Sequence, residues 1–341
     1  MKNTIGNNLT VTLFGESHGE SIGAVIDGIT PGINVDDGFI KEMLSRRRPS
    51  GKISTPRVEM DNYKIVSGVF SGKTTGTPIS IIIENTNTHS KDYEATRYLA
   101  RPSHAAYSAN CKYGGYEDFR GGGHFSGRIT APLVAVGGIL IPALQNKGIK
   151  IETRIKRIGK VCGEDFNDEM ETEILTARQN GDSVGGILET SVSGVPKGVG
   201  EPWFDTVESM LSHALFSIPA VKGVEFGAGF EFGGMLGSVA NDSFRMCDGE
   251  VVTSTNNSGG INGGITNGMP IVFRTAYRPT PTISKPQETV NIKTKENALL
   301  EAKGRHDPCI VHRARVVQDS VTAIIIADML IGRFGTDWLA E

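Results

Sequence analysis

The chain has 341 residues, a formal net charge of −3, 38% hydrophobic residues and 43 glycines. This composition excludes a disordered protein and predicts a turn-rich globular one with a sizeable core. The mild negative charge gives no general attraction for nucleic acid or an anionic membrane, so an anionic ligand must be bound by local clusters of Arg and Lys. The four cysteines are far apart without C-x-x-C spacing, which argues against a zinc site and fits a reduced cytosolic protein.

The first predicted elements are two short strands, 9–14 and 23–27, joined by a loop with the sequence GESHGES. His18 lies in this loop at the end of a strand, where a histidine faces a functional site more often than it packs in the core. A turn histidine without a function is the alternative.

A helix should follow, because Asp36 or Asp37 can cap it and apolar residues at helical spacing continue towards Pro49. Its last turn, 46–48, consists of three arginines, and the segment 45–58 has five Arg and Lys residues and no acidic one. The helix dipole would account for one or two cations here. Because uncompensated like charges repel, the full set predicts a strongly anionic partner.

The stretch RPSHAAYSANCKYGGYEDFRGGGHFSGR, 101–128, is too polar and too rich in glycine for a core segment. The N–H groups of Gly121–Gly123 can approach an anion closely, and Ser126 adds a hydroxyl donor. Positive charge comes from Arg101, Arg120 and Arg128. The apolar run 131–144 predicts a buried helix, too short to span a bilayer, whose N-terminus would favour phosphate. An ordinary basic loop is the alternative.

Parts of the sequence occur twice. The pattern G-x-x-x-G-x-T-x-G-x-P-I is found at 68–79, where it predicts a turn before a strand, and again at 260–271. Shorter matches accompany it in the same order. We therefore expect two related halves, about 10–145 and 180–335, each a sheet with helices. In the alternative, only the turn chemistry repeats.

The second half contains two further charged clusters and an acidic surface helix predicted at 167–180. Arg278, together with Thr280 and Thr282, forms a group of one cation and two hydroxyls that suits a phosphate. The turn GRHDP at 304–308 is also charged, although a solvated turn with a local His–Asp contact would explain it.

The last helix is predicted at 315–334. On a helical wheel Asp328 shares a face with Val317 and Ile324, whereas Asp319 lies opposite. A carboxylate among aliphatic neighbours is costly unless it is hydrogen-bonded or protonated, so Asp328 is a candidate acid or base. The alternative is a structural carboxylate bonded to an arginine or a backbone amide.

Seven motifs together resemble the chorismate synthase family along nearly the whole chain: FGESHG, SRRRP, SGVFSGKTTGTPI, the block from RPSHA to GGGHFSGR, AVKGVEFG, SGGINGGI and GRHDPC. The resemblance implies one large α/β domain over 1–341, a β-α-β sandwich of two pseudo-symmetric sheet-plus-helix halves rather than a Rossmann unit. It also implies sheets in the interior with helices outside, a homotetramer and a cytoplasmic location.

The same resemblance implies a lyase of the shikimate pathway. Family members convert 5-enolpyruvylshikimate 3-phosphate to chorismate and phosphate, and they require reduced FMN (FMNH2) although no net redox change occurs. The chain has little room for a reductase domain. Reduced flavin would therefore come from a flavin reductase in trans, with NADPH as a candidate ultimate donor.

By resemblance, His18 is the general acid for the departing phosphate, His104 protonates or stabilises the reduced flavin, and Asp328 helps the flavin accept the substrate proton. The substrate would be bound by Arg46, Arg47, Arg48, Lys52 and Arg101. The cofactor positions correspond to His124, Phe125, Ser126, Pro219, Ala220, Gly263, Arg278, Pro279, Thr280, Pro281, Thr282 and Arg305. No metal is implied.

Four positions depart from the family pattern. Ser103 and Ala106 stand where the family usually has Gly and Asp, His124 replaces an Arg, and Arg278 replaces a Lys. Arg278 keeps the charge. His124 keeps it only when protonated, so we expect FMN affinity to depend on pH near neutrality.

Two other classes of protein compete with this assignment. An NADPH-dependent flavin oxidoreductase has no support from a G-x-G-x-x-G fingerprint after a strand. A non-catalytic anion-binding module would bind phosphate but would assign no role to His18, His104 and Asp328.

Overall fold

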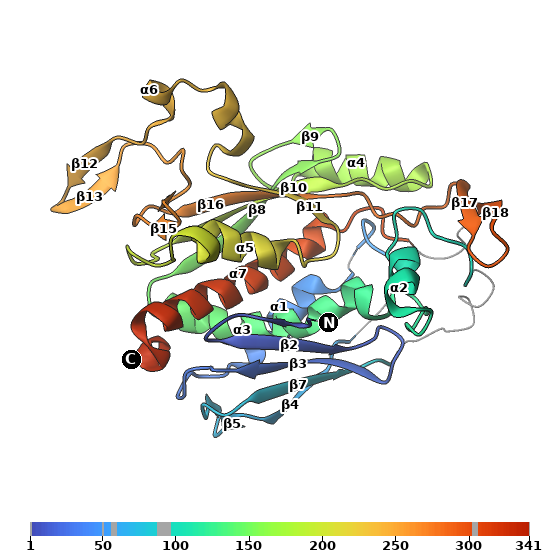
Figure 1. Ribbon diagram of the computed structural model, residues 1–341, viewed down its shortest axis with the longest axis horizontal. Helices are drawn as coiled ribbons and strands as arrows, with labels where there is room; N and C mark the ends of the chain where they lie inside the picture. Colours follow the sequence, from blue (N-terminus) through green and yellow to red (C-terminus); the bar gives the residue numbers. More distant parts are fainter. Residues whose placement is uncertain (1, 50, 56–59, 87–96, 302–305, 341) are drawn as a thin grey trace.

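Two five-stranded antiparallel sheets form the outer layers of the protein, with helices between them (Figure 1). The structure, a computed structural model, describes residues 2–49, 51–55, 60–86, 97–301 and 306–340. The first sheet has the order β1-β2-β3-β7-β4, with β1 at Thr4–Ile5, β2 at Thr10–Gly15, β3 at Ser21–Asp27, β7 at Ile79–Glu84 and β4 at Tyr63–Ser67. The second has the order β11-β16-β10-β8-β9, with β11 at Val221–Phe226, β16 at Ile271–Tyr277, β10 at Gly186–Ser193, β8 at Lys150–Ile158 and β9 at Val161–Cys162.

The helices between the sheets are α1 (Asp37–Arg47), α3 (Thr130–Asn146), α5 (Val207–Leu215) and α7 (Val311–Phe334). Helix α4 (Asp168–Gln179) covers the outer face of the second sheet, and α2 (Ala106–Tyr113) lies at one end of the sandwich (Figure 1). The remaining small elements include α6 (Gly237–Ala240) and four hairpins: β5–β6 (Val69–Phe70, Lys73–Thr74), β12–β13 (Phe244–Cys247, Glu250–Thr253), β14–β15 (Ile261–Asn262, Ile265–Thr266) and β17–β18 (Gln287–Asn291, Glu296–Leu300).

The elements predicted from the sequence are confirmed, with shifts of a few residues at their ends. Asp36 caps α1, because its side chain accepts a hydrogen bond from Phe39 N at 3.0 Å. Asn167 caps α4 in the same way through Met170 N at 2.9 Å. The β-α-β order is confirmed too, but the expectation of sheets inside and helices outside was wrong: the sheets are the outer layers.

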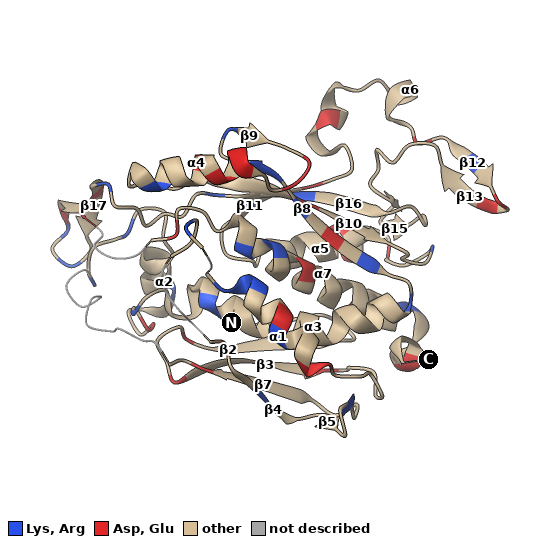
Figure 2. Cartoon of the chain, turned by 180° about the vertical axis from the view of Figure 1, so that it is seen from behind, with Lys and Arg blue, Asp and Glu red and all other residues tan. Residues whose placement is uncertain are grey.

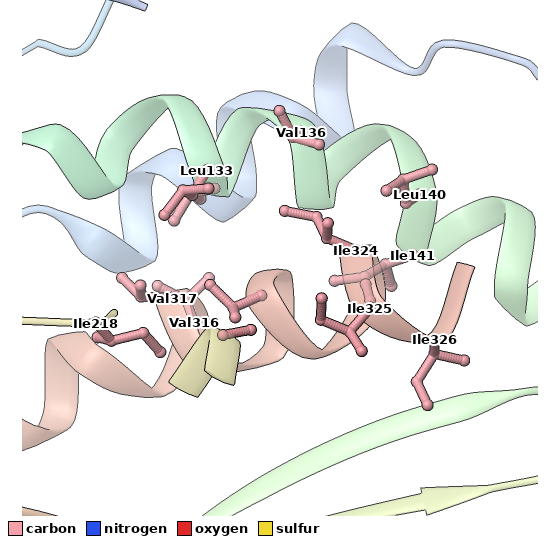
Figure 3. Close-up of a cluster of buried hydrophobic side chains, with 14 of the residues drawn as sticks. Leu133, Val136, Leu140, Ile141, Ile218, Val316, Val317, Ile324, Ile325 and Ile326 are labelled. Atoms are coloured by element: carbon pink, nitrogen blue, oxygen red, sulfur yellow. The ribbon is translucent and has the colours of Figure 1, made fainter. Parts of the chain in front are cut away.

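The reason for this arrangement is the apolar character of the two central helices. Of the 17 residues of α3, 14 are buried, and of the 24 residues of α7, 17 are buried. A helix that is apolar all round has to be covered on every side. Leu133 and Ile141 of α3 lie on the side towards α7, where Val317, Ile324 and Ile325 belong to the same cluster of buried side chains (Figure 3).

The expectation that helix α3 is too short to span a bilayer was wrong: with the turn before it, α3 belongs to a helical stretch, 127–146, that is long and apolar enough to cross a membrane, but 89% of its most apolar part is buried inside the protein. Close packing explains its glycines. A Cβ atom at Gly137 would lie 2.4 Å from Ser320 Cβ of α7, so a larger residue would push the two helices apart. The apolar character of α3 is therefore accounted for by its place in the core.

The two sheets repeat one topology. The order β2-β3-β7-β4 in the first corresponds to β8-β10-β16-β11 in the second, and in each half the helices α1 and α3, or α5 and α7, occur at matching points along the chain. The element that corresponds to β2 is β8. It begins at Lys150, so the repeat starts earlier than the boundary of about 180 expected from the sequence.

The repeated glycine pattern has the same structure in both halves. It forms hairpin β5–β6 before β7, and hairpin β14–β15 before β16. Thr74 Oγ1 accepts from Ile33 N at 2.9 Å and donates to Thr30 O at 2.6 Å. Thr266 Oγ1 makes the equivalent bonds, from Val199 N at 2.9 Å and to Pro196 O at 2.6 Å. The repeat therefore extends beyond turn chemistry.

The buried position of α7 also changes the interpretation of its acidic residues. The helical wheel placed Asp319 opposite the apolar face, but both faces of α7 are covered and Asp319 is buried. Burial raises the pKa of Asp319 from 3.8 to about 6, although Thr153 and Arg46 act in the opposite direction. Asp319 Oδ1 has no hydrogen-bond partner among the described residues.

Asp319→Asn should therefore stabilise the protein at neutral and alkaline pH. The folded protein binds the Asp319 proton more tightly than the unfolded chain does, so stability is lost as the pH rises from 3.8 to about 6. Without this charge, the free energy of unfolding at about pH 8 should rise by roughly 1–3 kcal/mol. Urea unfolding should show a smaller increase in the free energy of unfolding at about pH 5 than at about pH 8. A loss of stability at the higher pH would contradict this account.

Candidate active site

A cavity of about 630 Å³ lies between the end of β2 and the segment around α2. Its lining includes Glu16, Arg101, His104, Tyr113, His124 and Phe125. A volume of this size suits a small organic ligand. Polar and charged groups from both predicted loops, 15–21 and 101–128, thus face one space.

The histidine loop and the glycine loop pack directly on each other. Ser17 N donates to Gly123 O at 3.1 Å, and His124 Nδ1 lies 2.7 Å from Gly15 O. Since a carbonyl only accepts, Nδ1 of His124 carries a proton. The histidine loop and the glycine loop therefore form one surface, although His124 and Gly15 are 109 residues apart in the chain.

His18 is held in this contact. Its side chain is 7% exposed, and its Nδ1 lies 3.1 Å from Ser17 Oγ. Gly121 has a φ of +63°, and a Cβ atom there would lie only 2.4 Å from His18 Cε1. Gly121 is required for both reasons. Arg101 Nη2 donates to Gly121 O at 2.5 Å, which connects Arg101 to the same loop.

His104 has the strongest electrostatic signature of the candidate residues in the cavity. Burial lowers its pKa from 6.5 to about 3, and the charges of Arg101 and Arg278 act in the same direction. The imidazole is therefore neutral at neutral pH. Its Nδ1 accepts a hydrogen bond from Ala106 N at 3.0 Å, so Nε2 carries the proton and can donate to a ligand.

Arg278, from the second half of the chain, does not line the cavity, but it lies near enough to His104 for its charge to lower the pKa of that histidine. Arg278 N donates to Ala220 O at 3.0 Å, and Ser183 Oγ donates to Thr280 O at 2.7 Å. Two buried atoms, Arg278 Nε and Thr280 Oγ1, have no hydrogen-bond partner among the described residues. Buried polar atoms are normally satisfied, and a guanidinium beside a hydroxyl matches a phosphate group. These two atoms are therefore candidates for a phosphate site.

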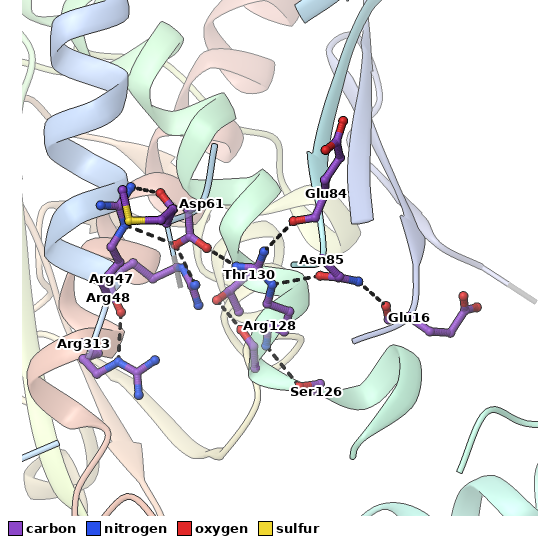
Figure 4. A network of polar contacts seen from close by, with 12 residues as sticks. Glu16, Arg47, Arg48, Asp61, Glu84, Asn85, Ser126, Arg128, Thr130 and Arg313 are labelled. Carbon is purple, nitrogen blue, oxygen red and sulfur yellow. Dashed lines mark hydrogen bonds and ion pairs between the residues drawn. The ribbon is translucent and has the colours of Figure 1, made fainter. Parts of the chain in front are cut away.

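The arginines of α1 have acidic partners, which corrects the prediction of an uncompensated basic segment. Arg47 is buried, and its Nη2 lies 2.8 Å from Asp61 Oδ2, while Arg128 Nη1 pairs with Asp61 Oδ1 (Figure 4). Burial alone would raise the pKa of Asp61, but the charges of Arg47 and Arg128 hold it below 3.8. Asp61 lies three residues beyond the segment 45–58, so the absence of acidic residues within that segment did not reveal it.

Positive charge still exceeds negative charge in this cluster. Arg48 Nε lies 3.9 Å from Asp61 Oδ2 and has no hydrogen-bond partner among the described residues. Arg128 N is bonded to Ser126 Oγ at 3.2 Å, so the cluster adjoins the glycine loop. Figure 2 shows the Lys and Arg residues of α1 and α7 between the two sheets.

Two residues that were not among the predicted site residues, Asp307 and Arg313, connect the basic segment 45–58 with the start of α7. Asp307 Oδ1 accepts from Thr55 N at 2.9 Å, and Asp307 Oδ2 lies 2.8 Å from Arg313 Nη1. Arg313 Nε donates to Arg47 O at 2.9 Å. Asp307, in the described part of the GRHDP turn, is thus bonded to two other segments of the chain. Arg305, its predicted cofactor residue, lies outside the described residues.

Three predicted site residues lie apart from this arrangement. Arg46 contacts Met43 Sδ at 3.5 Å and Asp319 at 3.6 Å, and the side chain of Lys52 is exposed. Gly263 is in the turn of β14–β15, before β16, whereas Arg278 follows the other end of β16. A strand of seven residues spans roughly 20 Å. Gly263 and Arg278 therefore do not face one site within a single chain.

Asp328 makes the contacts of a structural carboxylate. It is 1% exposed, and its oxygens accept hydrogen bonds from the backbone N–H groups of Asn7, Asn8 and Leu9 at 2.6–3.1 Å. It is absent from the lining of the cavity, as are His18 and Arg278. Of the two interpretations left open by the sequence, these contacts favour the carboxylate bonded to backbone amides.

Comparisons with known proteins agree over almost the whole chain. The profile of the chorismate synthase family matches residues 9–331. A chorismate synthase of Thermococcus kodakarensis is 46% identical over 345 residues, covering 96% of this chain and 97% of the relative. One of Chitinophaga pinensis is 47% identical over 329 residues, covering 96% of each. A crystal structure of chorismate synthase superimposes with a TM-score of 0.76 at 30% identity, covering 97% of this chain and 94% of that chain. The chain belongs to the chorismate synthase family.

Proposed function

We propose that the chain converts 5-enolpyruvylshikimate 3-phosphate to chorismate and inorganic phosphate by an anti-1,4-elimination that requires reduced FMN without net oxidation. Family membership supports this assignment. The observation that carries it is a pair of buried donors, Arg278 Nε and Thr280 Oγ1, that have no hydrogen-bond partner among the described residues, with Arg278 near enough to the neutral His104 of the cavity to lower its pKa. The two donors, Arg278 Nε and Thr280 Oγ1, fit the phosphate of FMN.

The cofactor would be held by residues from both halves of the chain. Arg278 and Thr280 would bind its phosphate, and His104 would donate a hydrogen bond through Nε2. Ser126 and Ala220, which are hydrogen-bonded to Arg128 and Arg278, would lie beside the cofactor. When bound, reduced FMN supplies electron density that assists the loss of phosphate.

The substrate carries a phosphate and two carboxylates, so it needs several cations. Arg48 and Arg101 are the arginines of the candidate set that we assign to it. Arg47 is used mainly to pair with Asp61. His18 would give a proton to the departing phosphate, as a general acid within hydrogen-bond reach. His104, flanked by Arg101 and Arg278, would remain neutral until an anion binds near it.

The proposal extends to the setting of the enzyme. We infer a homotetramer, a cytoplasmic location and supply of reduced flavin by a reductase in trans, with NADPH as the ultimate donor.

The direct test is an anaerobic assay with dithionite-reduced FMN. One phosphate and one chorismate should form for each 5-enolpyruvylshikimate 3-phosphate consumed, and the flavin should end the reaction reduced. Consumption of one NADPH per turnover would instead indicate a flavin oxidoreductase. No release of phosphate under these conditions would contradict the proposed function.

Arg278→Met should weaken FMN binding much more than riboflavin binding. A charge-assisted hydrogen bond contributes about 1.5–3 kcal/mol, so the Kd for FMN should rise roughly 10- to 100-fold. Riboflavin lacks the phosphate, and its Kd should hardly change. Arg274→Met is the matched control, because Arg274 lies four residues earlier in the chain, on β16, and pairs with Glu225 at 2.9 Å. Fluorescence titration measures the Kd for both flavins. An equal loss of affinity for FMN and riboflavin would show that the phosphate of FMN does not bind at Arg278.

A further inference from the structure

Asn85, the residue after β7, holds the loop that carries His18. Its side-chain Nδ2 donates to Glu16 O at 2.9 Å and to Gly19 O at 3.0 Å. Its backbone N donates to Glu20 O at 3.0 Å. The two carbonyls bound by the amide flank Ser17 and His18 on either side, so a single side chain binds both ends of the turn, which Gly19 N also closes by donating to Glu16 O at 3.1 Å.

The other side of the Asn85 amide is fixed as well. Oδ1 accepts from Arg128 Nε at 3.1 Å. Because a guanidinium only donates and a carbonyl only accepts, the amide can satisfy both neighbours in one orientation alone. Three of the hydrogen bonds that an asparagine side chain can make are therefore used, and the group cannot flip without losing them.

Arg128 itself is anchored in the core. It pairs with Asp61, the carboxylate that also holds Arg47. Figure 4 shows the resulting chain of contacts, from Arg47 through Asp61 and Arg128 to Asn85 and Glu16. The chain connects the arginines at the end of α1 with the loop of His18.

We propose that Asn85 is a positioning residue for His18, which it serves by fixing both ends of the turn 16–19 against the Asp61–Arg128 pair. The inference rests on the proposed role of His18 as general acid. A proton donor contributes to catalysis only when it is held at the correct distance from the leaving group, and such geometry depends on the residues behind it.

Asn85→Asp tests this directly, because the carboxylate can still accept from Arg128 but cannot donate to Glu16 O or Gly19 O. We expect kcat for phosphate release to fall roughly 10- to 100-fold, as for other supporting contacts of catalytic groups. The Kd values for substrate and FMN should change little. Asn256→Asp is the matched control, since Asn256 Nδ2 donates to Pro270 O at 2.9 Å in the other half. Its kcat should equal that of the wild type.

The decisive comparison is made in the His18→Ala background. If Asn85 acts through His18, then Asn85→Asp should cause no further loss of kcat there. A residue with a merely structural role would lower the rate in both backgrounds. Should Asn85→Asp fail to fold, Asn85→Ser replaces it with the same expected pattern, because a hydroxyl can donate to only one of the two carbonyls.

The outcomes separate this inference from the proposed function. An active wild type with a slow His18→Ala variant and a normal rate in Asn85→Asp would overturn the role of Asn85 and leave the function intact. An additive loss in the double variant would overturn it as well. A wild type that releases no phosphate would remove the proposed function, and the inference with it.

Discussion

His18→Ala is expected to slow phosphate release by roughly 10²–10⁴-fold, the usual contribution of a positioned proton donor. The fold and the affinity for FMN should be unchanged, because the imidazole lies against a glycine and alanine leaves the loop contacts of Ser17 N and His124 in place. Single-turnover measurements with reduced FMN give the rate of the chemical step, separate from product release.

The control for His18→Ala is His213→Ala, the same substitution at an exposed position in the last turn of α5. It should retain the wild-type rate. If His18→Ala also turned over at the wild-type rate, His18 would not be the general acid, and the contact between the two loops would have only a structural meaning.

Asp61→Asn is expected to cause the largest loss of stability. The side chain is fully buried and pairs with two arginines that are themselves 4% and 6% exposed. Removing one partner of a buried ion pair leaves uncompensated charge, and such changes cost about 3–5 kcal/mol of unfolding free energy. Urea unfolding at neutral pH measures the loss.

Asp37→Asn provides the comparison for Asp61→Asn. Asp37 pairs with Lys41 at 2.5 Å, but both side chains are more than half exposed. Solvent screens such a pair, so the change in unfolding free energy should stay within about 1 kcal/mol. Equal effects of the two substitutions would show that the Asp61 cluster is not a structural centre of the site.

Much of the fold followed from local sequence. The helix caps Asp36 and Asn167 and the apolar run of α3 are signals from residues close together in the chain. The structure has helices at the positions that these signals predict. The repeated glycine pattern also reported a real repeat, because the threonine within it makes the same two hydrogen bonds in both halves.

The layer order could not be obtained in the same way. A helical wheel divides a helix into a buried and an exposed face, and this division fails for α7, which is covered on both sides. Asp319 therefore seemed to lie on an outer face, although it is buried between a sheet and α1. The mistake has a physical origin, since the wheel carries no information on the number of layers.

The candidate site was partly predictable. Its cationic and histidine residues stood out as unusual chemistry in glycine-rich loops. The residues that organise them did not, because Asp61 meets Arg128 across 67 positions and Asn85 meets Glu16 across 69. Only the folded chain brings these partners together. Asp328 stood out in the sequence as a candidate acid or base, but its structural role was not predictable, because the backbone N–H groups that it binds lie 319–321 positions away.

The central claim is that two anions bind face to face, between the His18 loop and the Arg278–Thr280 cluster. A crystal structure of the chain with FMN and 5-enolpyruvylshikimate 3-phosphate tests it most directly. We predict that the FMN phosphate lies within hydrogen-bond distance of Arg278 Nε and Thr280 Oγ1, and that the substrate phosphate lies within the same distance of His18. Ligands bound on another surface, or in two separate cavities, would contradict the account.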